Sequence, residues 1–157
     1  TFEKNGKELA VISLQGRTFM PPLDCPFRTA EKLIGKAKTP CIFVDFHAEA
    51  SSEKKALAYW LDGRVSAIAG THTHVQTSDE QVLSGGTAFI SDVGMTGGHG
   101  GIIGMTAESV LPKFLYGTPS KFEICDTDVR FQAVIIDVDD ETGRGMDIRR
   151  INAPCEN

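Results

Sequence analysis

The sequence predicts a layered α/β sandwich with mixed sheets, and three features support this fold class. Apolar runs of strand length alternate with amphipathic helical segments in the first half of the chain. Segments with strand patterns and tight turns dominate the second half, an order typical of layered α/β architectures. The chain has 157 residues, of which 41% are hydrophobic and 24% charged, so we expect one globular domain or part of one.

The first half is expected to contain three strands separated by two helices. The dipeptide Asn5-Gly6 is typical of a hairpin turn. The run CIFVDF is almost continuously apolar, as in strands that are covered on both faces. Helical spacing in the second helix is expected to turn Leu57, Trp60 and Leu61 inward. In chain order we expect a strand at 9–14, a proline-containing loop at 15–27, a helix at 28–38, a strand at 41–46, a helix at 51–61 and a strand at 65–70.

The second half is expected to be richer in antiparallel strands. Tight polar turns separate its short apolar runs. Pro112 lies inside the one helical segment and is expected to bend or break it. In chain order we expect a hairpin at 81–83 and 87–90, a glycine-rich loop at 92–105, a helix at 106–116, and strands at 122–125, 130–138 and 146–151, the last two joined by a turn.

Polar residues directly follow three of the apolar strands. Asp45 and His47 lie at the end of one strand, His72 and His74 follow the next, and Asp92 follows a third. Ligand sites of α/β sheets lie beyond the carboxyl ends of the strands. We therefore expect these side chains to lie along one edge of the sheet.

The two histidines of GTHTHVQ are the strongest candidates for metal ligands. If this stretch is extended, both imidazoles point to one side, with their Cα atoms roughly 7 Å apart. That spacing suits two ligands of one metal, or one ligand on each of two metals, with His47 as a further ligand. A structural role also remains open for His72 and His74, in which the imidazoles bond loop carbonyls. Asp45 either orients His47 or bonds the backbone.

Other polar residues are weaker candidates. The glycine-rich loop could wrap a phosphate through its N–H groups, with Thr96 and Gly97 as contacts, although it matches no nucleotide-binding motif. Arg17 could meet an anionic substrate or simply be solvated at the surface. We expect His99, inside GGHGG, to be a loop histidine, and Glu49 to lead into a helix and not to bind metal.

The composition argues against several classes of protein. The net charge of −5 disfavours stable nucleic-acid or anionic-membrane binding. No apolar run approaches about 18 residues, and no signal-peptide core is present. The four cysteines form no CxxC motif, which fits a reducing cytoplasm as the expected location. A homo-oligomer is left open.

The ordered motifs DFHAEA, DGR, GTHTHVQT and DVGMTG closely resemble the YmdB-like branch of the calcineurin-type metallophosphoesterases. NGKELAVISLQGRTFMPPLD and VIIDVDDETG extend this resemblance over essentially the whole chain. The resemblance implies an αββα sandwich that hydrolyses phosphodiesters such as 2′,3′-cyclic nucleotides through a metal-bound hydroxide. It implies two divalent metal ions, iron or manganese in preference to zinc. By the same resemblance, His47 and His72 would bind one ion and His74 the other.

Part of the family's pattern is absent from this sequence. The GD, NxEN and GNH motifs, which would carry an Asp ligand, a bridging carboxylate and the general-acid His, do not occur. We therefore expect residues 1–157 to be the C-terminal portion of one metallophosphoesterase domain, inactive alone. Three histidines supply no negative charge to offset the repulsion between two ions. Two alternatives stay open: a mononuclear hydrolase with His47, His72 and His74 on one zinc, and a non-catalytic partner-binding fragment.

Overall fold

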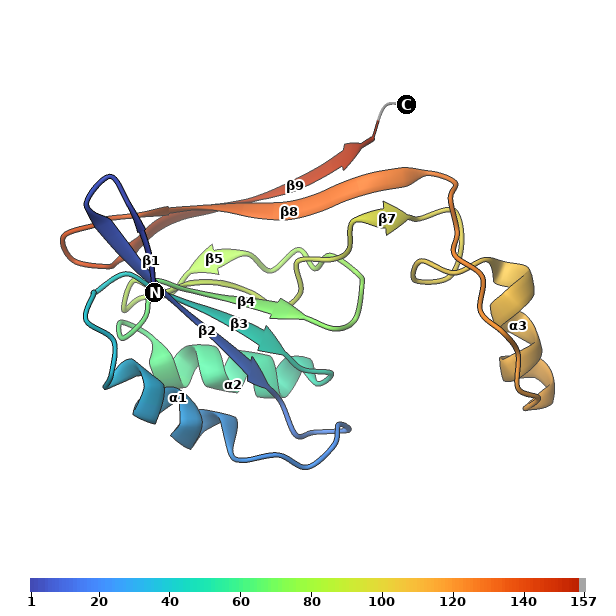
Figure 1. Ribbon diagram of the computed structural model, residues 1–157, viewed down its shortest axis with the longest axis horizontal. Helices are drawn as coiled ribbons and strands as arrows, with labels where there is room; N and C mark the ends of the chain where they lie inside the picture. Colours follow the sequence, from blue (N-terminus) through green and yellow to red (C-terminus); the bar gives the residue numbers. More distant parts are fainter. Residues whose placement is uncertain (156–157) are drawn as a thin grey trace.

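The computed structural model describes residues 1–155 and contains two sheets and three helices (Figure 1). The elements are β1 (Phe2–Lys4), β2 (Lys7–Gln15), α1 (Pro26–Ile34), β3 (Ile42–His47), α2 (Ser51–Leu61), β4 (Ala67–Thr71), β5 (Gln81–Val82), β6 (Ala88–Ile90), β7 (Gly97–Gly98), α3 (Ala107–Tyr116), β8 (Val129–Val138) and β9 (Gly145–Pro154). The larger sheet has the strand order β1-β2-β3-β4-β6-β5, and the smaller has the order β7-β8-β9.

The larger sheet is mixed, as the sequence predicts. Strands β2, β3, β4 and β6 are mutually parallel, whereas β1 and β5 are antiparallel to their neighbours. Helices α1 and α2 cover one face of this sheet, and β8 and β9 lie over the other (Figure 1). The residues that the structure describes thus form three consecutive layers of the expected αββα arrangement.

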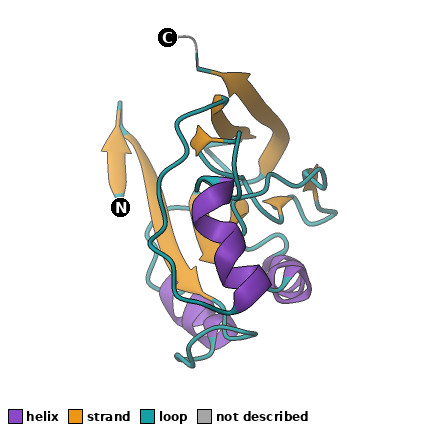
Figure 2. Ribbon diagram, turned by 90° about the vertical axis from the view of Figure 1, so that its right-hand side faces the viewer, coloured by secondary structure: helices purple, strands orange, loops and turns teal. Residues whose placement is uncertain are grey.

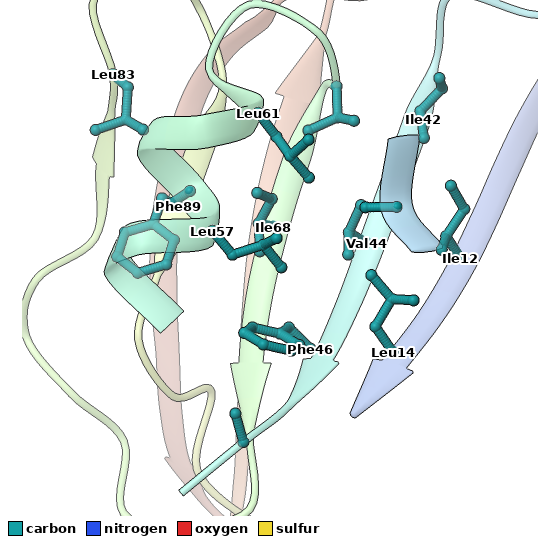
Figure 3. Close-up of a cluster of buried hydrophobic side chains, with 14 of the residues drawn as sticks. Ile12, Leu14, Ile42, Val44, Phe46, Leu57, Leu61, Ile68, Leu83 and Phe89 are labelled. Atoms are coloured by element: carbon teal, nitrogen blue, oxygen red, sulfur yellow. The ribbon is translucent and has the colours of Figure 1, made fainter. Parts of the chain in front are cut away.

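The main hydrophobic core lies between α2 and the larger sheet (Figure 3). Leu57 and Leu61 of α2 are fully buried against strand side chains such as Phe46. Burial of each such side chain contributes about 1.5–3 kcal/mol. Trp60 was predicted to face inward, and this prediction is wrong because its side chain is 53% exposed. The inward positions are spaced i, i+3, i+4 and i+7 from Lys54, and Trp60 lies about 110° round the helix from their centre.

Helix α1 begins and ends earlier than predicted. It starts at Pro26, whose fixed φ suits the first helical position and whose missing N–H needs no partner there. It ends at Ile34, and two tighter bonds follow, from Lys36 N–H to Leu33 O and from Ala37 N–H to Ile34 O. Ala37 lies in these turns at a position that fits the helical spacing of apolar residues, and the predicted helix at 28–38 therefore extended too far.

Three features of the second half differ from expectation. The predicted loop at 92–105 contains β7, which pairs with β8. The predicted strand at 122–125 is reduced to a single bridge between Met105 and Ile124. Pro112 lies within α3 and does not end it. Strands β8 and β9 pair along their length as predicted, with a register shift at Asp137/Val138.

The parallel strands deliver their carboxyl ends to one side of the molecule. Gln15 is in register with His47, and His47 is in register with Thr71, so β2, β3 and β4 end together. Helix α3 stands on the side to which these strands point, and it lies in front when the molecule is viewed from there (Figures 1 and 2). Within residues 1–155 no helix is long and apolar enough to cross a membrane.

Candidate metal centre

The carboxyl ends of β3 and β4 bring two of the predicted ligands into contact. His47 is the last residue of β3 and pairs in register with Thr71, the last residue of β4. His72 follows directly, and its Nδ1 lies 3.1 Å from His47 Nε2. The two rings are nearly perpendicular, at 85°, with centroids 4.8 Å apart. The predicted grouping of these two imidazoles at the sheet edge is therefore present.

Hydrogen bonds on the outer side of each ring define which nitrogen carries a proton. Thr71 Oγ1 donates its single hydrogen to Asp45 Oδ1 at 3.2 Å, so it can only accept from His47 Nδ1 at 3.1 Å. Glu49 Oε2, an acceptor, lies 3.0 Å from His72 Nε2, which must be the donor. In neutral rings His47 Nε2 and His72 Nδ1 therefore both carry lone pairs.

Two lone pairs that face each other at 3.1 Å require a cation between them, either a shared proton or a metal ion. Nitrogen ligands about 2.1 Å from one metal are about 3.0 Å apart at a right angle and about 3.4 Å apart at the tetrahedral angle. The separation between His47 and His72 lies between these values. Oxygen acceptors on the outer nitrogens are also the usual setting of metal-bound histidines. The pair thus fits a divalent metal ion.

His74 points elsewhere. Its Nδ1 donates to the backbone oxygen of Ile103 at 3.0 Å, which leaves the lone pair on Nε2. The condition under which both imidazoles would point to one side, an extended backbone, is not met, because the φ angles of His72 and His74 are 112° and 64°. Positive φ is unfavourable for residues other than glycine and is often found at functional sites.

A buried ion pair holds the segment between these two histidines. Thr73 N–H donates to Asp92 Oδ2 at 3.0 Å, and Gly94 N–H donates to Asp92 Oδ1 at 2.9 Å. Lys54 Nζ bonds the same Asp92 Oδ2 at 2.9 Å, and both side chains are almost fully buried. Sequence reasoning missed Lys54, although its place at an inward position of α2 is a signal of a buried, paired lysine.

Asp79 holds the far end of the same loop against Ser91, the residue that follows β6. Its carboxylate accepts hydrogen bonds from Thr77 Oγ1 at 2.7 Å, from Ser91 Oγ at 2.6 Å and from Ser91 N–H at 3.1 Å. Burial raises the pKa of Asp79, but the hydrogen bonds from Ser91 and Thr77 outweigh it and hold this pKa below its ordinary value. The loop is therefore anchored at its middle and at its end.

The remaining candidates occupy separate positions. Asp45 orients His47 only through Thr71, and its other oxygen accepts from Ser13 Oγ at 3.4 Å. The Arg17 side chain is exposed beyond β2, and its backbone N–H donates to Glu53. Thr96 is exposed next to β7, and Gly97 lies in β7.

Glu49 and His99 have roles that the sequence did not reveal. Glu49, expected to be a helix-approach residue, contacts His72. The spacing of Glu49 two residues after His47 at a strand end was the available signal. His99 Nδ1 donates to Gly97 O at 2.9 Å, while its Nε2 is buried and has no partner among residues 1–155.

The described part of the chain supplies only an incomplete ligand set. In residues 1–155, no group of three or more His, Cys, Asp or Glu is arranged to hold a metal ion. His47 and His72 form the nucleus of a site that needs ligands from elsewhere.

Comparison with known proteins reveals close relatives that are longer than this chain. A Bacillus subtilis (strain 168) protein named 2′,3′-cyclic-nucleotide 2′-phosphodiesterase is 54% identical over 149 residues, which cover 94% of this chain and 56% of that protein. The crystal structure of a hypothetical protein from Thermus thermophilus matches with a TM-score of 0.90 and 43% identity, covering 98% of this chain and 61% of that chain. A crystal structure described as a novel phosphatase, from Mycoplasma pneumoniae, matches with a TM-score of 0.86 and 35% identity, covering 98% and 56%.

These matches agree with the motifs and with the layered fold. The chain spans about half the length of the curated relatives that it matches. Residues 1–151 match the family described as YmdB-like protein. The chain therefore belongs to the YmdB-like protein family.

Proposed function

We propose that this chain carries part of the metal site of a phosphodiesterase that hydrolyses small phosphodiesters such as 2′,3′-cyclic nucleotides. The observation that carries this proposal is the convergence of two lone-pair nitrogens, His47 Nε2 and His72 Nδ1, at 3.1 Å. The name of the Bacillus subtilis relative supports the reaction class and the substrate class. The completing ligands and the general acid are assigned to the half of the relatives that this chain does not match.

Each histidine has a defined part in this proposal. His47 and His72 would hold one divalent cation, and His74 Nε2 would hold a second. Such cations supply Lewis-acid charge that activates water and neutralises the phosphoryl oxygens. Thr71 and Glu49 keep protons on the outer ring nitrogens, so the inner lone pairs stay directed at the cation.

The substrate contacts are proposed from the end of β2 and from the start of β7. Arg17 follows the end of β2, next to His47, and its exposed guanidinium would attract an anionic phosphodiester. Thr96, exposed next to β7, is proposed to bond phosphate oxygens, and Gly97, which has open space where a Cβ would lie, is proposed to let the phosphate approach. These residues would bind and orient the phosphodiester.

The geometry favours this function over the two alternatives. A mononuclear zinc site made of His47, His72 and His74 needs all three imidazoles to converge, whereas His74 bonds Ile103 O and points elsewhere. A purely structural role for the histidines would need a proton shared between the facing lone pairs of His47 and His72.

Histidine NMR offers a direct test of the metal site, because the chain has only four histidines. In a ¹⁵N-imidazole spectrum titrated with Zn²⁺, we expect the signals of His47 and His72 to shift before that of His99. The His72→Ala variant should bind Zn²⁺ at least about tenfold more weakly, because one ligand is lost. Glu31→Ala, on the distant helix α1, is the matched control. Unchanged Zn²⁺ affinity in His72→Ala contradicts the assignment.

Hydrolysis of bis-p-nitrophenyl phosphate tests the activity itself. We expect no turnover by the 157-residue chain, and turnover with two bound metal ions when the upstream half of the Bacillus subtilis relative is fused before Thr1. His72→Ala in that fusion should abolish turnover. Turnover by the isolated chain, or by the His72→Ala fusion, contradicts the proposal.

A further inference from the structure

A pocket of about 440 Å³ lies beside His74, outside the contact between His47 and His72. Its volume falls within the range of about 300–1,000 Å³ that is usual for small-molecule sites. The pocket is lined by His74 and Gly101 and by two further groups of residues. The apolar group is Val75, Met95, Ile102 and Ile103, and the polar group is Gln76, His99 and Gln132. The mixture of several apolar walls and few polar groups is typical of ligand sites.

One side of the pocket is fixed by Gln76. Its Nε2, which carries two hydrogens, lies within hydrogen-bond distance of three backbone oxygens, those of Val93, Ala133 and Ile151, at 3.1–3.2 Å, so one hydrogen is shared. Ala133 and Ile151 belong to the smaller sheet, whereas Gln76 lies in the loop after β4. The side chain therefore ties the pocket wall to both sheets, and the pocket is formed before any ligand binds.

Gln132 is held just as firmly on the opposite strand. Its Oε1 accepts from Met95 N–H at 3.0 Å. Gly94, at φ +83°, makes this approach possible, because a Cβ at that position would clash with Gln132 Oε1. The amide NH₂ of Gln132 has no hydrogen-bond partner among residues 1–155 and is the donor that this wall offers a ligand.

His99 forms one wall of the pocket. Its Nδ1–H donates to Gly97 O, and its Nε2 is fully buried without a hydrogen-bond partner among residues 1–155. A ligand in the pocket therefore meets the ring of His99 and not its Nε2 lone pair.

We propose that this pocket binds the nucleobase of a nucleotide substrate, an inference that rests on the function proposed above. A flat heterocycle would place its faces against Ile102 and Ile103 and its edge near the Met95 thioether, which favours aromatic partners. Its polar edge would accept from the Gln132 NH₂. His74, shared by the pocket and the proposed metal site, places the phosphate next to the base.

Methionine methyl groups report on this pocket directly. The chain has four methionines, so a protein labelled with ¹³C at the methionine methyls gives four signals. We expect adenosine to shift the Met95 signal in a saturable way and to leave Met20 and Met146, outside the pocket, unshifted. Ribose and inorganic phosphate should leave Met95 in place. If millimolar adenosine does not shift Met95, or if ribose shifts it equally, the proposal is overturned.

A variant in the apolar wall provides the second readout. Ile103 has φ 45°, a conformation that Asn tolerates, so Ile103→Asn removes the apolar wall and keeps the carbonyl that orients His74. It should weaken adenosine binding by about fivefold or more. Ile124→Asn, also exposed and outside the pocket, is the matched control. Equal affinity of Ile103→Asn and wild type for adenosine contradicts the base site. Failure of the wild-type chain to bind Zn²⁺ at His72 would instead contradict the proposed function.

Discussion

Replacing Lys54 by methionine tests whether the buried ion pair holds the loop that carries His72 and His74. Methionine keeps the length of the apolar stem and removes only the ammonium group. Asp92, 1% exposed, would then lie without its cation. Breaking a buried pair from one side costs about 3–5 kcal/mol. That is a large part of the roughly 5–15 kcal/mol that stabilises a typical domain, and it corresponds to a fall in Tm on the order of 10 °C.

The structure also makes a less usual prediction for the double variant Lys54→Met/Asp92→Leu. Apolar replacement of a buried ion pair is often neutral or stabilising. Here Asp92 also accepts from the N–H groups of Thr73 and Gly94. Each donor left unsatisfied costs about 1–3 kcal/mol. We therefore expect the double variant to remain at least about 2 kcal/mol less stable than wild type.

Urea unfolding followed by circular dichroism measures both effects. Lys55→Met is the matched control, because Lys55 is the exposed neighbour on α2 and its loss should change stability by less than about 0.5 kcal/mol. Imidazole signals should show His72 and His74 shifted in Lys54→Met. A free energy of unfolding for Lys54→Met within about 1 kcal/mol of the control, or a double variant as stable as wild type, would refute the reasoning.

Three further predictions concern the same edge of the sheet. Gly70→Ala should cost at least about 3 kcal/mol in urea unfolding, because its Cβ would overlap the backbone oxygen of Ser91, whereas Gly35→Ala, with only ordinary contacts, should be nearly neutral. Because the folded-state pKa of Asp79 is lowered, its carboxylate stabilises the fold above the unfolded pKa of about 3.9 and loses this effect as pH falls through the folded pKa. The stability difference between wild type and Asp79→Asn should therefore shrink below about pH 4. Gln76→Met should cost about 2–3 kcal/mol, since three backbone oxygens lose their donor, and an unchanged urea midpoint would contradict this.

Local patterns in the sequence were sufficient for most of the secondary structure. The apolar run at 41–46 and the helical spacing at 51–61 match β3 and α2 closely. Boundaries failed where backbone chemistry outweighed apolar spacing, as at Pro26, which starts α1 two residues early. The segment 122–125, predicted to be a strand, forms only one bridge because no partner strand lies alongside it. Strand pairing depends on the tertiary structure and not on the local sequence.

In the candidate site, too, local sequence patterns predict some features and tertiary contacts decide the others. That His47, His72 and His74 follow strand ends is evident from the sequence, because parallel strands end at one edge. The links from Lys54 to Asp92 and from Glu49 to His72 join residues that are 38 and 23 positions apart, and no local pattern relates them.

The sequence by itself determined the family resemblance, the order of strands and helices, and which residue types reach the edge of the sheet. Only the tertiary structure decided which imidazole nitrogens face each other. The register of β3 against β4 places His47 beside Thr71, and the positive φ of His72 turns its ring back toward His47. A separation of 3.1 Å between His47 Nε2 and His72 Nδ1 depends on both, because interatomic distances across a sheet follow from strand pairing and backbone torsion and not from local propensity.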